Sequence, residues 1–231
     1  MSTDRSNSLD LIGWWMGLAG LVLIFAGFFV IDPGGWNGPD SPVRELAAEL
    51  TNNRARIAVG STVGIVAGLV LVGFVASLRM RLAREGSKGE LLALVAYAFG
   101  IIMTIGAFVH ASFRLATSAP IDPNMLTDAV LPLSMLKEHS SDLFMIGALG
   151  VAATMSVSSF VVGLLPKPMA WVGVVLVVAT VALIPTNLGV GGLALFLWLI
   201  VACSVLIVRD RTAGTHGSPQ SPSGQMEHES S

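Results

Sequence analysis

The residue types best suited to chemistry are two histidines near the ends of neighbouring apolar runs. His110 and His139 are the only histidines that precede the C-terminal segment. An imidazole can ligate haem iron or zinc, and Asp142 or Glu138 would be available as a further zinc ligand. Because the spacing matches no diagnostic metal motif, we expect no cofactor, and haem or a metal ion at His110 and His139 is the alternative.

Other polar side chains accompany these histidines. Arg114 follows His110 by four residues and Asp142 follows His139 by three, so each pair shares a helix face. If a connection on the outer side joins the two helices, Arg114 and Asp142 are expected to form an ion pair across them. Asn187, in a later connection, is expected at the same level. The sequence thus predicts an outer polar cluster, which is either a binding site or an ordinary membrane border.

Membrane helices are the elements that must position this cluster. Of 231 residues, 53% are hydrophobic and 12% are charged. Several runs without charge reach the roughly 20 residues that a helix needs to cross a bilayer. The run over residues 168–208 is about twice that length and has turn residues near its middle. We predict an all-α polytopic membrane protein whose six helices form a bundle, with spans at residues 11–31, 57–78, 91–115, 141–165, 169–185 and 190–208.

Composition and motifs exclude several classes of protein. The 13 basic residues lie mostly between the apolar runs, which excludes nucleic acid as a partner. A single cysteine, Cys203, allows no intramolecular disulfide. The chain has no phosphate loop, serine-hydrolase elbow or zinc-protease helix, so we do not predict an enzyme. Uncharged span centres argue against ion-coupled transport, but they leave a permease for a neutral or amphipathic solute as an alternative.

Basic residues in the connections predict the orientation, because Lys and Arg near span ends are retained in the cytoplasm. With both termini inside, eight basic residues are inner and five are outer. The short loop over residues 79–88 contributes four of the inner ones. We therefore predict a cytoplasmic N-terminus (1–10), a membrane domain (11–208) and a disordered cytoplasmic tail (209–231) that is rich in Ser, Gly and Pro.

A stripe of glycines runs along the second span. Gly60, Gly64 and Gly68 recur every four residues. Small residues let membrane helices approach closely, which is how such helices associate in lipid. The stripe predicts a helix contact, either within the chain or between copies in a homo-oligomer or membrane complex.

Each long outer connection contains an amphipathic segment. Ser41-Pro42 and Asp122-Pro123 both combine a helix cap with a proline in the first turn. Apolar residues then follow on one face (Val43, Leu46, Ala47 and Leu50; Met125, Leu126, Ala129, Val130 and Leu133). The two segments are expected either to lie at the membrane interface or to cover a pocket.

Three short motifs carry a resemblance to known families. Gly13-Trp14-Trp15 lies in the first span, and Pro-x-Arg-Glu (42–45) and Asn-Asn-Arg-Ala-Arg-Ile (52–57) precede the second. In this layout, over residues 9–208, the chain resembles uncharacterised six-span membrane proteins of bacteria that are grouped as families of unknown function. The resemblance implies no activity. Ten arginines against three lysines, with abundant Ala, Gly and Val, are also typical of GC-rich bacterial genomes.

Together these patterns predict an integral protein of a bacterial plasma membrane that catalyses no reaction. We expect an accessory component or a protein that binds a lipid or small solute, with membrane lipids as partners. The alternatives are a haem- or metal-binding redox protein using His110 and His139, and a permease.

Overall fold

Helices make up nearly all of the described chain, as predicted. The computed structural model describes residues 3–31, 50–118, 126–183 and 188–215, and these residues contain no strand. Asn187 and the first amphipathic segment lie outside the described residues. The elements are α1 (Thr3–Phe25), the π-helix η1 (Ala26–Ile31), α3 (Arg54–Ala83), α4 (Ser87–Thr117), α5 (Leu126–Val161), α6 (Lys167–Leu183) and α7 (Leu188–Thr215).

Five stretches in these helices are long and apolar enough to cross a membrane. They are Ser8–Phe28, Arg54–Ala83, Ser87–Thr117, His139–Val161 and Gly192–Thr212. The predicted span at 169–185 corresponds to α6, which has 17 residues. At that length α6 is about 25 Å long, somewhat shorter than a hydrocarbon core of about 30 Å. The five apolar helices indicate a multi-pass membrane protein.

Several helices extend beyond the predicted spans. α1 begins at Thr3, and the start of α5 takes in most of the second amphipathic segment, continuing through Pro132. α7 continues to Thr215, so residues 209–215 are helical rather than part of a disordered tail. Hydropathy alone underestimates these helices because their ends are polar; the ends of α1 and α7 make contacts with other parts of the chain, described below.

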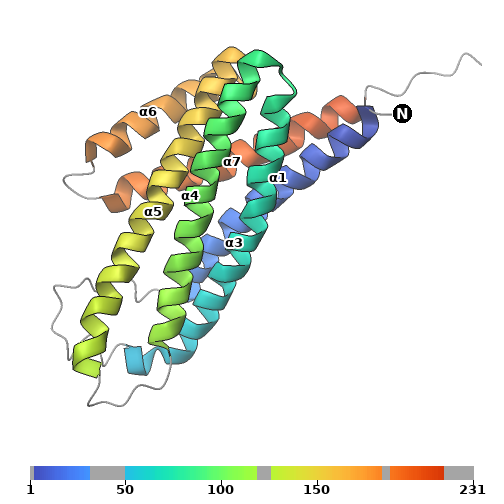
Figure 1. Ribbon diagram of the computed structural model, residues 1–231. Coiled ribbons are helices and arrows are strands. Elements are labelled where there is room, and N and C mark those ends of the chain that lie inside the picture. The colour runs from blue at the N-terminus through green and yellow to red at the C-terminus, as the bar shows by residue number, and fades with distance from the viewer. Residues whose placement is uncertain (1–2, 32–49, 119–125, 184–187, 216–231) are drawn as a thin grey trace, which may run out of the picture.

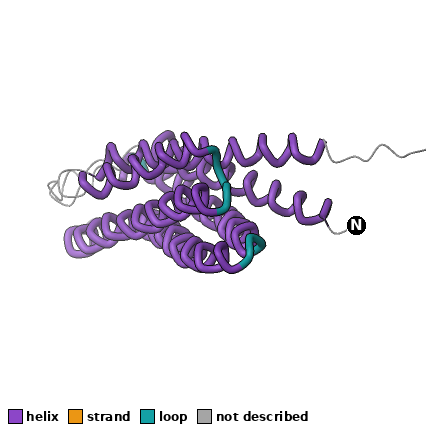
Figure 2. Tube along the Cα trace, turned by 90° about the horizontal axis from the view of Figure 1, so that it is seen from above, coloured by secondary structure: helices purple, strands orange, loops and turns teal. Residues whose placement is uncertain are grey.

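The helices form two groups that pack against each other (Figure 1). α3, α4 and α5 lie side by side, while α1 and α7 pair and run obliquely to them. α6 contacts α5 and α7. The α3–α4 and α5–α6 turns lie at one end of the bundle, which Figure 2 views from above. We call this end, where Asp10 lies, the Asp10 end, and the opposite end the His110 end.

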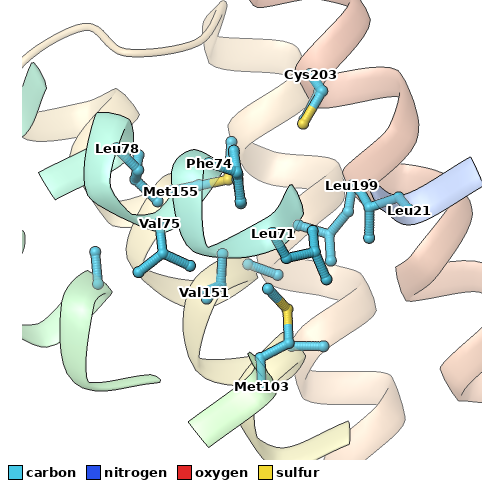
Figure 3. Close-up of a cluster of buried hydrophobic side chains, with 14 of the residues drawn as sticks. Leu21, Leu71, Phe74, Val75, Leu78, Met103, Val151, Met155, Leu199 and Cys203 are labelled. Carbon is cyan, nitrogen blue, oxygen red and sulfur yellow. The ribbon is translucent and has the colours of Figure 1, made fainter. Parts of the chain in front are cut away.

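Apolar side chains from five helices converge between the two groups (Figure 3). Each of the largest has at most 1% of its surface exposed: Leu21 of α1, Leu71 and Phe74 of α3, Met103 of α4, Met155 of α5 and Leu199 of α7. Hydroxyl groups near this core donate hydrogen bonds to carbonyls four residues earlier in their own helices, as in Thr104, Thr154, Ser156 and Ser159. These four hydroxyl groups are thereby satisfied without water.

Glycines set the closest helix approaches. A Cβ on Gly64 would lie 2.8 Å from Cζ of Phe28, and one on Gly68 would lie 3.3 Å from the Phe108 ring. The glycine stripe therefore packs against η1 and α4 of the same chain. Closer still, a Cβ on Gly106 would overlap the backbone of Phe144, so α4 and α5 touch backbone to backbone.

Candidate functional site

His110 of α4 contacts two other elements, η1 and α5. Its half-buried ring meets Phe28 of η1 edge to face, with ring centroids 4.7 Å apart. Nδ1 of His110 lies 3.4 Å from the hydroxyl oxygen of Ser140 in α5. The same Phe28 ring fills the space left by Gly64. π-Helical segments are frequent at functional sites, and η1 here fixes the position of an imidazole.

His139 does not face His110. Its side chain is 80% exposed, and its Nδ1 lies 3.6 Å from Oδ2 of Asp142 on the same helix. Ser140 is the α5 residue that meets His110, and successive helical residues point about 100° apart. The structure therefore does not turn the two imidazoles toward one cavity. Among the described residues, no three His, Cys, Asp or Glu side chains are grouped to hold a metal ion.

Arg114 is buried, with 5% of its surface exposed, in the last turn of α4. Among the ion pairs of the described residues there is none between Arg114 and Asp142; the partner found for Asp142 is His139, three residues earlier on α5. Nearby, Nε of Arg54 donates to the carbonyl of Ser118, which ties the start of α3 to the end of α4. The predicted cluster is thus divided into a His110–Ser140 contact and a separate, solvent-exposed His139–Asp142 pair.

A larger polar network lies at the Asp10 end. Asp10 of α1 is 3% exposed, and its Oδ2 accepts a hydrogen bond of 2.7 Å from Nη1 of Arg84. Nε of Arg81 lies 3.9 Å from the same oxygen. Trp14, one turn further along α1, donates from Nε1 to Oδ2 of Asp210 in α7 at 2.8 Å. These contacts fasten α1 to α3 and α7.

The end of α7 is fastened in a similar way. Arg209 donates from Nη1 to the carbonyls of Gly163 and Leu164, at 2.7 and 2.8 Å. These carbonyls lie just beyond the C-terminal end of α5, where backbone acceptors have no partner in the helix. The Arg211 guanidinium stacks 5.2 Å from the centroid of the Trp15 ring. These arginines were among the basic residues that predicted the orientation, but no pattern in the sequence indicated their partners.

An apolar groove lies between α4, α5 and α6. Its volume is about 430 Å³, within the range of small-molecule sites. α5 forms its floor, while α4 and α6 form its walls. The only polar side chain in it is Thr154, whose hydroxyl already donates to the Gly150 carbonyl. The lining residues are Leu92, Val95, Phe99, Ile146, Leu149, Gly150, Ala153, Thr154, Val157 and Val177.

No pattern in the sequence indicated this groove. Gly150 and Ala153, which line it, lie in the fourth predicted span. In the structure, Gly150 makes room for the Phe99 ring. No family model, curated protein or solved structure matches the chain, so its function is inferred from its own residues.

Proposed function

We propose that this chain is a six-span protein of a bacterial plasma membrane that holds a lipid or a small apolar solute in the groove between α4, α5 and α6, and that it catalyses no reaction. The groove is the observation that carries the proposal. An apolar hollow without a titratable lining group complements a hydrocarbon surface and provides no acid, base or nucleophile.

The outward faces of the helices support a membrane location. Large apolar side chains are exposed on several helices, including Leu91 at 67% and Val175 and Val178 at 62% each. In water such surfaces would drive association, whereas lipid tails solvate them. α6 serves as the sixth span in this proposal, since a bilayer can thin locally around a short helix.

Basic residues support placing the Asp10 end in the cytoplasm. Four of them lie in the α3–α4 connection and the adjoining helix ends, Lys167 begins α6, and Arg209 and Arg211 lie near the end of α7. This orientation puts both termini inside. A protein of this kind would act as an accessory component that retains its ligand within the bilayer, alone or in a membrane complex.

The groove can be tested by filling it. Ala153→Phe places a ring on its floor, and Leu94→Phe enlarges a side chain that is 61% exposed and does not line the groove. After purification in lipid nanodiscs and washing, mass spectrometry should find a tightly retained apolar ligand in the wild type and in Leu94→Phe. Ala153→Phe should lose it. Retention by Ala153→Phe at the wild-type level would show that the ligand binds elsewhere or that no groove site exists.

Orientation and chemistry have separate tests. On a Cys203→Ala background, a cysteine at Ser87 should react with an impermeant reagent only after cells are opened, and one in segment 122–134 should react in intact cells. Labelling of Ser87→Cys in intact cells would mean that the topology is the reverse of the proposed one. An absorption spectrum with a Soret band, or one metal ion per chain, would contradict the absence of redox chemistry and favour the histidine alternative.

A further inference from the structure

A positively charged residue, Lys88, lies one turn before the groove-lining residues of α4, and this points to a specific class of lipid. We propose that the groove takes an acyl chain of an anionic phospholipid from the leaflet at the Asp10 end, and that the ammonium group of Lys88 binds the lipid phosphate. The inference rests on the proposed function, because it names the ligand of the same groove.

The first argument is the register of α4. Leu92, Val95 and Phe99 line the groove, and Lys88 precedes Leu92 by four residues. Positions 88, 92, 95 and 99 follow the spacing of a single helix face. Lys88 is exposed and lies in the first turn of α4, next to the α3–α4 turn at the Asp10 end. The apolar wall of the groove therefore leads along one helix face to a cation at the membrane border.

The second argument is the contrast between Lys88 and its neighbours. Arg84 donates to Asp10, Arg81 donates to Glu85 at 2.7 Å, and the Arg79 guanidinium lies 4.8 Å from the Tyr97 ring centroid. Within the described part of the chain, Lys88 has no ion pair. Of the four cations around this turn, Lys88 is the one whose charge the rest of the described chain leaves available for a phosphate.

The third argument concerns selectivity. A hydrocarbon chain gains little hydrophobic free energy when it moves from surrounding lipid into an apolar groove, because both environments are apolar. Packing against Phe99 and the small residues Gly150 and Ala153 favours retention of any acyl chain. Discrimination between lipids must then come from the headgroup, where a lysine near the membrane surface attracts anionic lipid.

The test uses the full chain in vesicles that contain a trace of phospholipid with a photoreactive diazirine in its acyl chain. One probe carries the anionic phosphatidylglycerol headgroup and the other the zwitterionic phosphatidylcholine headgroup. Adducts mapped by mass spectrometry should concentrate in residues 92–99 and 146–157, above the level on Leu197 and Val201 of α7, which are exposed and do not line the groove. The anionic probe should give about fivefold more groove adducts than the zwitterionic one.

Charge variants decide the role of Lys88. Lys88→Glu should abolish the headgroup preference, and Lys88→Arg should keep it. Lys167→Glu is the matched control, because it makes the same charge change at an exposed lysine at the same end of the bundle, and it should leave the preference intact.

The outcomes separate the two proposals. Groove adducts that form equally with both headgroups, or a preference that survives Lys88→Glu or is lost equally in Lys167→Glu, would overturn the assignment of Lys88 and leave the groove as a lipid site. Adducts distributed in proportion to exposure, with no enrichment in the groove, would overturn both the inference and the proposed function.

Discussion

At the Asp10 end, charged side chains join helices that are far apart in the sequence, whereas at the His110 end the clearest charged pair lies within a single turn of α5. Asp10 reaches Arg84, and Trp14 reaches Asp210 across 196 residues. His139 and Asp142 are three residues apart, and both are exposed to solvent by 45% or more. The His110 half of the bundle has close backbone packing, as at Gly106, and a hydrogen bond from Arg54 to the carbonyl of Ser118.

This difference shows where charge contributes to stability in a membrane bundle. A carboxylate that is buried at the end of the bundle and contacts an arginine of another helix restrains both helices. A solvent-exposed pair within one helix gains little, because water screens it and the side chains lose entropy. The polar residues that stand out in the sequence for their chemical types are therefore not the ones that hold the helices together.

The largest expected effect is at the His110 half of the bundle and comes from packing. Gly106→Ala would push a methyl group into the backbone of Phe144 and separate α4 from α5. We expect a loss of about 3 kcal/mol in unfolding free energy, measured by circular dichroism during titration with sodium dodecyl sulfate in mixed micelles. Gly68→Ala is the control, since its Cβ would lie 3.3 Å from the Phe108 ring, a tight contact with a side chain rather than with a backbone, and it should cost clearly less. Equal effects would contradict the assigned helix contact.

The next effect tests the network at the Asp10 end. Asp10→Ala removes the buried acceptor of Arg84 and the contact with Arg81, and should cost about 2 kcal/mol. The value is below that of a fully buried pair because both arginines are partly exposed. Glu85→Ala breaks the exposed pair with Arg81 and should cost less than about 0.5 kcal/mol in the same titration. If both variants lost the same unfolding free energy, the burial of Asp10 would not strengthen its contacts with the arginines.

A smaller effect is expected for the contact between α1 and α7. Trp14→Phe keeps most of the buried ring but removes the hydrogen bond to Asp210, and should cost about 1 kcal/mol. Asp210→Asn keeps an acceptor and should cost less. Faster hydrogen exchange at residues 209–212 in Trp14→Phe would show that this bond stabilises the helical end of α7. Unchanged exchange would contradict that role.

The smallest effect is expected at the exposed pair of the His110 end. Asp142→Asn and His139→Ala should each change the unfolding free energy by less than about 0.5 kcal/mol. The double variant should equal the sum of the two within error. A coupling energy above about 1 kcal/mol in this cycle would mean that the pair is stronger than its exposure indicates, and the contrast between the two ends would not hold.

The α class and the positions of the long helices were predictable because they depend on local properties. A run of about 20 uncharged apolar residues must satisfy its backbone internally in lipid, and a helix does so within the run. The hydroxyls of Thr154, Ser156 and Ser159 bond within their own helix in the same way, whereas the buried Ser158 hydroxyl has no partner among the described residues. Helix ends were less predictable: α7 continues to Thr215, and near its end Arg209 binds carbonyls of the α5–α6 turn while Asp210 accepts from Trp14 of α1.

The candidate sites show the limit of sequence patterns. Spacing correctly puts His139 and Asp142 on one face, but it does not reveal that Ser140, rather than His139, turns toward His110. The groove is even harder to predict from the sequence, because its lining comes from three helices. It exists only where their side chains do not fill the space between them.

The sequence by itself determined that this chain is helical, apolar along its spans and charged at their ends, since hydropathy and helix periodicity act over one or a few turns. The tertiary structure alone decided which charge meets which, which glycines lie at backbone contacts, and where a hollow remains. These features depend on the relative rotation and tilt of whole helices, and the packing of many side chains sets that geometry together. Lys88 illustrates both levels: its position at the start of α4 follows from the sequence, and its place beside an apolar groove follows from the fold.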